Sequence, residues 1–250
     1  MIVNINGRDL LASPEETLLQ VARRNGIAIP TLCEHAGLEP WGGCRLCVVE
    51  MTRGTAGPTR IVPSCLQPAE DGLRVETHTA RILRIRAVLL DLLLARAPEA
   101  RRIQELALAH GVKSTSFVPR VDPDKCILCN ICVRACAAVG ADALGTAGRG
   151  AAGRIALPFG DDASACVGCG ACALSCPTGA IEMTDRGSER RIWGRTFQRL
   201  PCPACGAPTL TREHAAHLAG RSGLPSESFG MCERCRREQA SRQFLDLVGK

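Results

Sequence analysis

Sixteen cysteines constrain what this 250-residue chain can fold into, because they fall into four spaced sets of four. The first set has the uneven spacing C-x10-C-x2-C-x17-C, and the next two share one run, C-x2-C-x2-C-x3-C, placed 40 residues apart. The last set joins two C-x2-C pairs through 26 residues. In chain order the sets are Cys33, Cys44, Cys47, Cys65; Cys126, Cys129, Cys132, Cys136; Cys166, Cys169, Cys172, Cys176; and Cys202, Cys205, Cys232, Cys235.

Four-cysteine sets at such spacings are typical of iron–sulfur and zinc sites. Disulfides are the alternative use of cysteine and are expected in a secreted chain. The N-terminus lacks a basic segment followed by an apolar one, so we expect no export signal. The longest apolar run, within Ala87–Ala95, is interrupted by Asp91, and we expect no membrane span. A reducing cytoplasm is therefore the predicted compartment.

The composition also favours small domains held together by metal. Tyrosine is absent, and five Phe and two Trp give little bulk for a large core. The formal charge of +6 counts every cysteine as neutral. Four loaded thiolate sites would each carry about −2 and leave a net charge near −2, so nucleic acid is not an expected partner. The arginines within Arg81–Arg86 and Arg186–Arg199 either offset cluster charge, face acidic partners or are solvated surface.

The first 75 residues predict a small α+β domain. Ile2–Ile5 and Arg8–Ala12 flank the hairpin turn Asn6-Gly7. Ser13–Glu16 then predicts a helix start with a capping box, and Gly26 predicts its end. Cys44 and Cys47 are close enough to bind one iron together, and Gly42 and Gly43 leave room for backbone N–H groups to approach sulfur. The spacing alone also suits zinc.

The residues around these cysteines favour an iron–sulfur cluster over zinc. Thr31-Leu-Cys33-Glu-His35, Gly42-Gly-Cys44-Arg-Leu-Cys47-Val-Val-Glu50 and Pro63-Ser-Cys65 closely resemble a [2Fe–2S] domain of bacterial NADH:quinone oxidoreductase, where it is the N-terminal part of the peripheral-arm subunit. The same domain occurs in diaphorase subunits of NAD-linked nickel–iron hydrogenases, in NAD-linked formate dehydrogenases and in iron-only hydrogenases. The resemblance implies a β-grasp ferredoxin fold that binds a [2Fe–2S] cluster through Cys33, Cys44, Cys47 and Cys65.

The connecting segment departs from that family. His78–Arg96 predicts a helix with Ile82, Ile85, Leu89 and Leu92 on one face and Arg81, Arg84 and Arg86 elsewhere. The family next carries a histidine and three cysteines spaced H-x3-C-x2-C-x5-C. Anchored on Leu92-Leu-Leu-Ala-Arg-Ala97-Pro98, these positions become Ala97, Arg101, Gln104 and His110, so we expect this cluster site to be absent.

The doubled run is typical of a bacterial ferredoxin with two [4Fe–4S] clusters, in which the fourth cysteine of each run binds the other cluster. We therefore predict two sites: Cys126, Cys129, Cys132 with Cys176, and Cys166, Cys169, Cys172 with Cys136. The exchange would hold the two clusters close together. Zinc in both sites is the alternative.

The spacer between the runs extends the family resemblance to roughly residues 1–185. The segments that carry it are Ala143–Gly150 and Leu157-Pro-Phe-Gly160. Gly148, Gly150 and Gly153 also match the G-x-G-x-x-G pattern of dinucleotide-binding folds. That pattern requires a preceding strand and a following helix in a βαβ unit, and neither is apparent here.

The last set of cysteines predicts a closed, tetrahedral zinc site formed by Cys202, Cys205, Cys232 and Cys235. A single-iron site of the rubredoxin type has the same ligands. We expect a short helix over Thr211–Gly220, with His214 and His217 not serving as ligands. Arg236–Val248 predicts an exposed amphipathic helix that a partner could bind. The family resemblance does not reach this tail.

These features predict an α+β multidomain chain. Residues 1–78 form a [2Fe–2S] β-grasp domain, 79–118 a helical connector, 119–186 a 2[4Fe–4S] ferredoxin-like domain and 187–250 a zinc-ribbon-like tail. The resemblance implies an electron-transfer subunit between a flavin- or NAD(P)-handling subunit and a catalytic subunit. Because the chain stops soon after the ferredoxin domain, we favour a nickel–iron hydrogenase over a formate dehydrogenase or electron-bifurcating complex.

The sequence contains no evident base, nucleophile or open metal site, so we expect this chain to be non-catalytic by itself. A protein of another class, a redox sensor or assembly factor that binds partners through its zinc ribbon, is the alternative. The tight pairing of the two ferredoxin runs favours electron transfer, because a sensor would not need two clusters side by side.

Overall fold

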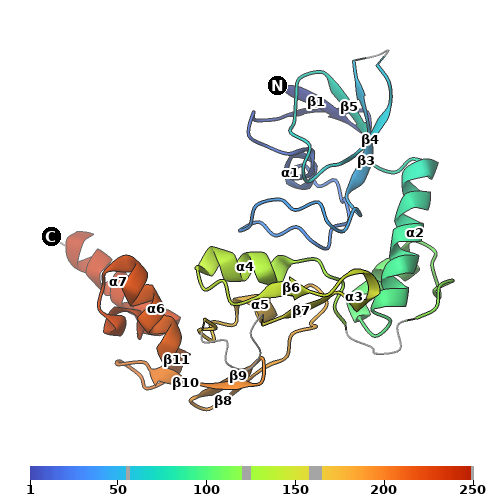
Figure 1. The fold of residues 1–250 in the computed structure, drawn as a ribbon. Helices are drawn as coiled ribbons and strands as arrows, with labels where there is room; N and C mark the ends of the chain where they lie inside the picture. The colour runs from blue at the N-terminus through green and yellow to red at the C-terminus, as the bar shows by residue number, and fades with distance from the viewer. Residues whose placement is uncertain (55–56, 120–124, 158–164, 249–250) are drawn as a thin grey trace. The chain divides into compact units, whose positions relative to one another are not determined.

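A computed structural model describes residues 1–54, 57–119, 125–157 and 165–248, apart from the side chains of residues 246 and 247 (Figure 1). The chain divides into two compact units. The first unit contains residues 1–134 together with 175–180, and the second contains residues 135–174 and 181–250. Each unit is described by itself. Residues 158–160 of the Leu157–Gly160 segment lie outside the described residues.

The first unit begins with a mixed five-stranded sheet of order β2-β1-β5-β3-β4. Only β1 and β5 run parallel, and the remaining neighbours are antiparallel. The turn between β1 and β2 is the predicted one, since Asn6 and Gly7 both have positive φ, 53° and 78°. The strands are β1 (Ile2–Ile5), β2 (Arg8–Leu11), β3 (Val48–Arg53), β4 (Arg60–Pro63) and β5 (Leu73–Glu76).

Helix α1 (Leu18–Arg24) buries Leu18, Leu19 and Val21 in the core of this sheet. The predicted helix start at Ser13 is wrong. Thr17 is the N-cap and forms a capping box with Gln20, because its side chain accepts from the Gln20 N–H while Gln20 accepts from the Thr17 N–H. Ser13 instead belongs to the preceding turn, where its N–H donates to Glu16.

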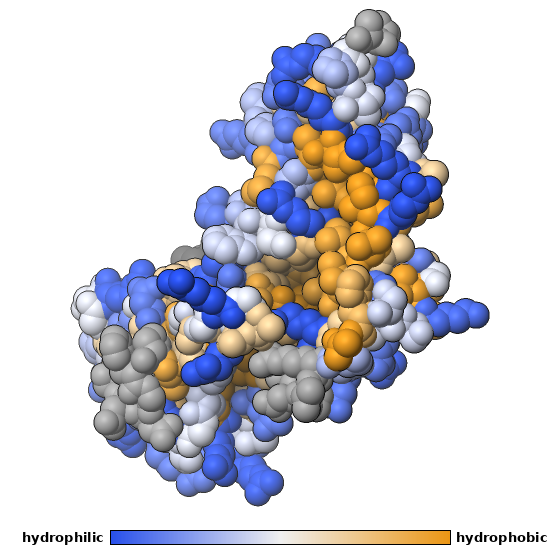
Figure 2. All heavy atoms as spheres, turned by 45° about the vertical axis from the view of Figure 1, so that its right-hand side comes forward, coloured by the Kyte–Doolittle hydropathy of each residue, from blue (hydrophilic) through white to orange (hydrophobic). Residues whose placement is uncertain are grey.

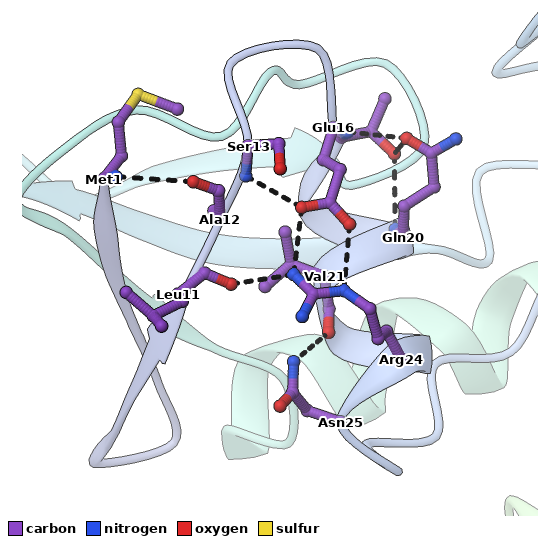
Figure 3. A network of polar contacts seen from close by, with 10 residues as sticks. Met1, Leu11, Ala12, Ser13, Glu16, Gln20, Val21, Arg24 and Asn25 are labelled. Carbon is purple, nitrogen blue, oxygen red and sulfur yellow. Dashed lines mark hydrogen bonds and ion pairs between the residues drawn. The ribbon is translucent and has the colours of Figure 1, made fainter.

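Glu16 connects this turn to the end of α1 (Figure 3). Its carboxylate accepts from Arg24 Nε and Nη2 at 3.0 and 2.9 Å, and Arg24 lowers the pKa of Glu16. A lowered pKa gives stability that is present above the ordinary value near 4.3 and is lost as the pH falls through the lowered value.

We expect Glu16→Gln to destabilise the protein at pH 7 by about 0.5–1 kcal/mol, because the ion pair is only partly shielded from water. Urea unfolding followed by circular dichroism measures this at 0.05 M and 1 M salt, and the difference should shrink at high salt. Glu15→Gln, an exposed neighbour, is the control. Equal losses in the two variants would show that the Arg24 contact contributes nothing.

Helices α2 (Ala80–Arg96) and α3 (Arg101–Ala109) form the rest of the first unit's core. The predicted helix α2 is present, and its predicted apolar face is buried only in part, since Ile82 is buried and Leu89 packs against the core. Four buried positions are spaced by four residues, Ile82, Arg86, Leu90 and Leu94, and Ala95 is buried as well, whereas Leu92 is 45% exposed. Figure 2 shows apolar side chains gathered on the side of the molecule where α2 lies. Leu83 and Val88, both on α2, are exposed.

The second unit holds a four-stranded antiparallel sheet of order β11-β10-β9-β8, which the sequence did not predict. Its strands are β8 (Met183–Arg186), β9 (Glu189–Ile192), β10 (Arg195–Pro201) and β11 (Pro208–Thr211). Two short strands, β6 (Gly145–Ala147) and β7 (Arg154–Ala156), pair around the single turn η1 (Gly150–Ala152). The G-x-G-x-x-G match therefore lies in a hairpin and opens no α-helix.

The helices of the second unit carry or flank the remaining cysteines. Helix α4 (Ile131–Val139) runs from the first unit into the second, and α5 (Ala171–Leu174) is one short turn. Helix α6 (Arg212–Ser222), capped by Thr211, matches the helix predicted over Thr211–Gly220. The 3-10 helix η3 (Ser226–Phe229) precedes α7 (Glu233–Val248), which begins three residues before the predicted helix and exposes Phe244 and Leu245.

Candidate iron–sulfur and zinc sites

The first cysteine set converges at one edge of the N-terminal sheet. Cys33 follows α1, Cys44 and Cys47 lie in the loop that enters β3, and Cys65 follows β4. The Cys47 and Cys65 sulfurs lie 3.3 Å apart, and the Cys44 N–H donates to the Cys33 sulfur at 3.3 Å. Cys33, Cys47 and Cys65 are buried. Four cysteines brought together from three segments, three of them buried, suit a cluster held by thiolates.

Hydrogen bonds within this set shift the pKa values of its thiols. Hydrogen bonding from Cys44 lowers the pKa of Cys33 to about 6, with backbone N–H groups of Cys44 and Gly43 contributing. Hydrogen bonding from Cys65 likewise lowers the pKa of Cys47 to about 7. The two donor thiols have raised pKa values, first because of these same bonds. The Gly43 N–H approaches sulfur as the sequence predicts.

Arg86 was missed by the sequence analysis as a component of this site. Its side chain is fully buried, and it donates from Nε to Leu46 O at 3.0 Å and from Nη2 to Val48 O at 2.9 Å. These carbonyls flank Cys47. Burial lowers the pKa of Arg86, and the Cys47 thiolate opposes that shift. Nη1 has no hydrogen-bond partner among the described residues. A buried cation thus lies beside a site whose loaded form is anionic.

The first four-iron set gathers around the start of α4. Cys126 and Cys129 precede the helix and Cys132 lies in it, while Cys176 lies in the 175–180 segment of the same unit. Burial raises the pKa of Cys129 to about 11, and the nearby thiolates of Cys176 and Cys126 contribute to the shift. Cys176 also accepts the Ala180 N–H at 3.3 Å. The structure therefore brings Cys176 to the Cys126 run.

Arg134 connects this set with the first one. It donates from Nη2 to Cys33 O and from Nη1 to Glu39 O, both at 2.6 Å, and lies 5.8 Å from the ring centroid of Trp41. Cys44 and Cys129 pack against one hydrophobic cluster that contains Leu32, Leu46 and Ile127. The thiolate of Cys33 contributes to the raised pKa of Cys129. The two sets are thus held in one packed core.

The second four-iron set lies entirely in the second unit. Cys136 on α4 and Cys172 on α5 are buried, and they line one pocket with Cys166 and Cys169. Burial raises the pKa of Cys172 to about 11 and also raises that of Cys136, with the Cys166 and Cys169 thiolates adding to both shifts. The structure therefore brings Cys136 to the Cys166 run.

Two donors point at the sulfurs of the second set. The Ala143 N–H donates to Cys136 at 3.2 Å, and the Trp193 indole N–H donates to Cys172 at 3.4 Å. Hydrogen bonds to ligand sulfurs are one of the means by which a protein tunes a cluster. Trp193 was missed by the sequence analysis, because it is distant from the cysteine runs along the chain.

The last set forms a four-sulfur site between β10 and α7. All four sulfurs, those of Cys202, Cys205, Cys232 and Cys235, lie within 4.8 Å of one another. The Cys205 and Cys232 sulfurs are 3.7 Å apart. A tetrahedral zinc with Zn–S bonds of about 2.3 Å requires S–S distances of about 3.8 Å. The Cys232 N–H lowers the pKa of Cys202 to about 6. Geometry and donor set both fit a four-thiolate metal.

The residues at the positions of the family's histidine and three cysteines make other contacts in this chain. Ala97 is the buried C-cap of α2, Gln104 donates to Pro98 O at 2.7 Å, and the His110 ring bonds Leu106 O at 2.9 Å. In the tail, the His217 ring bonds Val139 O at 2.9 Å. No helix among the described residues has both the length and the apolar character to cross a membrane.

Comparison with known proteins identifies two iron–sulfur domains in this chain. Residues 2–80 match a family model described as "2Fe-2S iron-sulfur cluster binding domain", and residues 119–183 match a "4Fe-4S dicluster domain". The fold and its cysteine sites therefore define an iron–sulfur protein with a [2Fe–2S] domain and a dicluster [4Fe–4S] domain.

Individual relatives show which kind of iron–sulfur protein this chain resembles. The chain is 32% identical to a subunit of the NADH-quinone oxidoreductase of Rhizobium meliloti (strain 1021), over 82% of this chain and 26% of that protein. It is 30% identical to NADPH-Fe(3+) oxidoreductase subunit alpha of Geobacter sulfurreducens, over 85% of this chain and 28% of that protein. The chain thus spans about a quarter of the length of these relatives.

A solved NAD+-reducing [NiFe]-hydrogenase, in the H2-reduced state, contains a chain of similar fold. The TM-score is 0.56 and the identity 33%, over 66% of this chain and 77% of that one. The chain belongs to the family of iron–sulfur electron-transfer subunits found in NAD(P)-linked hydrogenases and NADH:quinone oxidoreductases. This confirms the resemblance seen in the cysteine motifs.

Proposed function

We propose that this chain relays electrons between a flavin- or NAD(P)-handling subunit and a catalytic subunit, which we take to be a nickel–iron hydrogenase. The observation that carries the proposal is the packing of two cysteine sets in one core, where Arg134 binds the Cys33 carbonyl and Cys44 and Cys129 share a hydrophobic cluster. Iron–sulfur clusters supply one-electron redox chemistry when bound. The residues of the chain hold, orient and shield them.

The proposal assigns three clusters to twelve cysteines. A [2Fe–2S] cluster belongs to the β-grasp domain, residues 1–78, and two [4Fe–4S] clusters belong to residues 119–186. Residues 79–118 connect these domains. The proximity of Cys176 to Cys129, and of Cys136 to Cys166 and Cys169, supports the exchange of the fourth ligand. The ligands are Cys33, Cys44, Cys47, Cys65; Cys126, Cys129, Cys132, Cys176; and Cys166, Cys169, Cys172, Cys136.

The tail, residues 187–250, is proposed to be a zinc-ribbon-like module with zinc on Cys202, Cys205, Cys232 and Cys235. The sulfur spacing supports a closed tetrahedral site, and zinc in such a site is redox-silent and structural. A reducing, cytoplasmic setting is part of the proposal, because cysteines that bind metal must stay reduced.

We expect native mass spectrometry of the loaded protein to find about one zinc per chain, and Cys205→Ser to lose that zinc while iron content stays unchanged. Cys205 is the most exposed of the four ligands, so its substitution disturbs packing least. Finding one additional iron in place of zinc, with a reversible rubredoxin-type absorption, would replace the zinc assignment with a single-iron site.

Anaerobic isolation of the native complex, followed by mass-spectrometric identification of the subunits, tests the proposed function. A nickel–iron large subunit together with a flavin subunit is the expected result. A molybdopterin subunit would overturn the hydrogenase assignment and keep the electron relay. Isolation without any redox partner would overturn the relay itself and favour a sensor or assembly role.

A further inference from the structure

The turn between β9 and β10 places a tryptophan where one is rarely found. Ile192 pairs with Arg195, so the turn has two residues, Trp193 and Gly194, with φ of 54° and 74°. Two-residue turns with both φ values positive favour Asn-Gly, and a bulky side chain with positive φ is an outlier. Such a conformation persists only where surrounding contacts hold the residue in place. Strained residues of this kind cluster at functional sites.

The indole of Trp193 reaches the second four-iron set. Its Nε1 lies 3.4 Å from the Cys172 sulfur, in hydrogen-bonding geometry. Trp193 and Ile192 line the same pocket as Cys136, Cys166, Cys169 and Cys172. The strained turn therefore delivers one N–H donor to a sulfur in the interior of this pocket.

The surrounding hairpin is bonded to the loop that carries two of these cysteines, Cys166 and Cys169. Arg190 on β9 donates from Nη1 to Gly168 O at 3.2 Å and to Cys169 O at 3.0 Å, and Arg195 on β10 donates to Cys166 O at 3.2 Å. The ring of Phe197 lies against Gly168, where an added Cβ would come within 2.6 Å of it. These contacts fix the position of the turn relative to Cys172.

A contact from β11 completes the attachment. The buried Thr211 hydroxyl donates to Val167 O at 2.5 Å. Strand β10 leads directly to Cys202, and Thr211 caps α6, so the sheet that covers this pocket is continuous with the four-sulfur tail. The tail and the second cluster site are therefore parts of one packed structure.

We propose that the β9–β10 hairpin covers the second [4Fe–4S] cluster and that Trp193 sets its reduction potential by donating a hydrogen bond to the Cys172 thiolate. The inference rests on the proposed function, which places that cluster on Cys166, Cys169, Cys172 and Cys136. Reduction adds one electron to the cluster, supplied by a chemical reductant or a neighbouring cluster, and breaks no bond of the protein. Because the reduced cluster is more negative, the donor stabilises it and raises its potential.

The test is an anaerobic redox titration of the full-length loaded protein, monitored by electron paramagnetic resonance. We expect Trp193→Phe, which keeps an aromatic ring and removes the N–H, to lower one of the two [4Fe–4S] midpoint potentials. The expected shift is about tenfold in the ratio of reduced to oxidised cluster, or about 59 mV for one electron. Phe244→Leu, at an exposed aromatic residue of α7, is the control and should leave both values unchanged.

A second measurement needs no substitution. In protein labelled with 15N at the tryptophan indole, pulsed resonance of the reduced clusters should detect a 15N coupling that Trp193→Phe abolishes and Phe244→Leu retains. If neither the potential nor this coupling depends on Trp193 while both [4Fe–4S] clusters are present, the inference is wrong and the proposed function stands. If the wild-type protein holds only one [4Fe–4S] cluster, both are wrong.

Discussion

Substituting Cys176 should abolish the cluster of the Cys126 run and spare the cluster of its own run. The structure places Cys176 near Cys129, in the 175–180 segment that packs with residues 1–134. Losing one of four thiolates opens a buried, charged cluster to water and removes an iron–thiolate bond that stabilises a small domain. Cys176→Ala should therefore lose about four irons per chain, measured by iron and sulfide analysis.

Iron content alone does not tell which cluster is lost, so a background lacking the first three ligands is required. In the Cys126→Ala/Cys129→Ala/Cys132→Ala protein, one [4Fe–4S] signal should remain. Adding Cys136→Ala should remove it, whereas adding Cys176→Ala should leave it unchanged. The reverse result would show that each run binds its own cluster and would refute the exchanged assignment.

Replacing Arg86 with methionine should destabilise the cluster-loaded protein by about 2–4 kcal/mol. Methionine fills a similar length but leaves the Leu46 and Val48 carbonyls buried without donors, and each such loss costs about 1–3 kcal/mol. The substitution also removes the buried cation beside Cys47. Since that cation favours the more negative, reduced form, the [2Fe–2S] midpoint potential should fall as well.

Arg84→Met is the matched control, because Arg84 lies on the same helix and is exposed. Thermal unfolding of both variants, with clusters loaded, and a redox titration of the [2Fe–2S] signal measure the two effects. A stability loss in Arg86→Met without any change of potential would mean that Arg86 only satisfies carbonyls. Equal behaviour of the two variants would contradict both roles.

Local chemistry made much of the first domain predictable. The Asn6-Gly7 turn forms as expected, because few other residue pairs adopt two positive φ values in a row. The start of α1 was predicted four residues too early, at Ser13. Ser13–Glu16 and Thr17–Gln20 both carry cap-forming side chains, and the choice of Thr17 depends on which turn packs against the sheet.

The positions of Arg86 and Trp193 could not be predicted from local sequence patterns. An arginine on an apolar helix is expected to face water, yet Arg86 is buried because the chain brings the Leu46 and Val48 carbonyls within reach from nearly forty residues away. Trp193 carries no local sign of a role near sulfur, and it acquires one only because β9 and β10 fasten to the Cys166–Gly170 loop.

The sequence by itself predicted which residues bind metal and in which sets, because ligand type and short spacings are local properties. It also determined the family, through the residues that surround those cysteines. Only the tertiary structure decided what lies around each site, since a buried cation and an indole donor depend on contacts between distant segments. The cysteine sets can be recognised from the sequence, whereas the electrostatic environment of each set depends on tertiary packing.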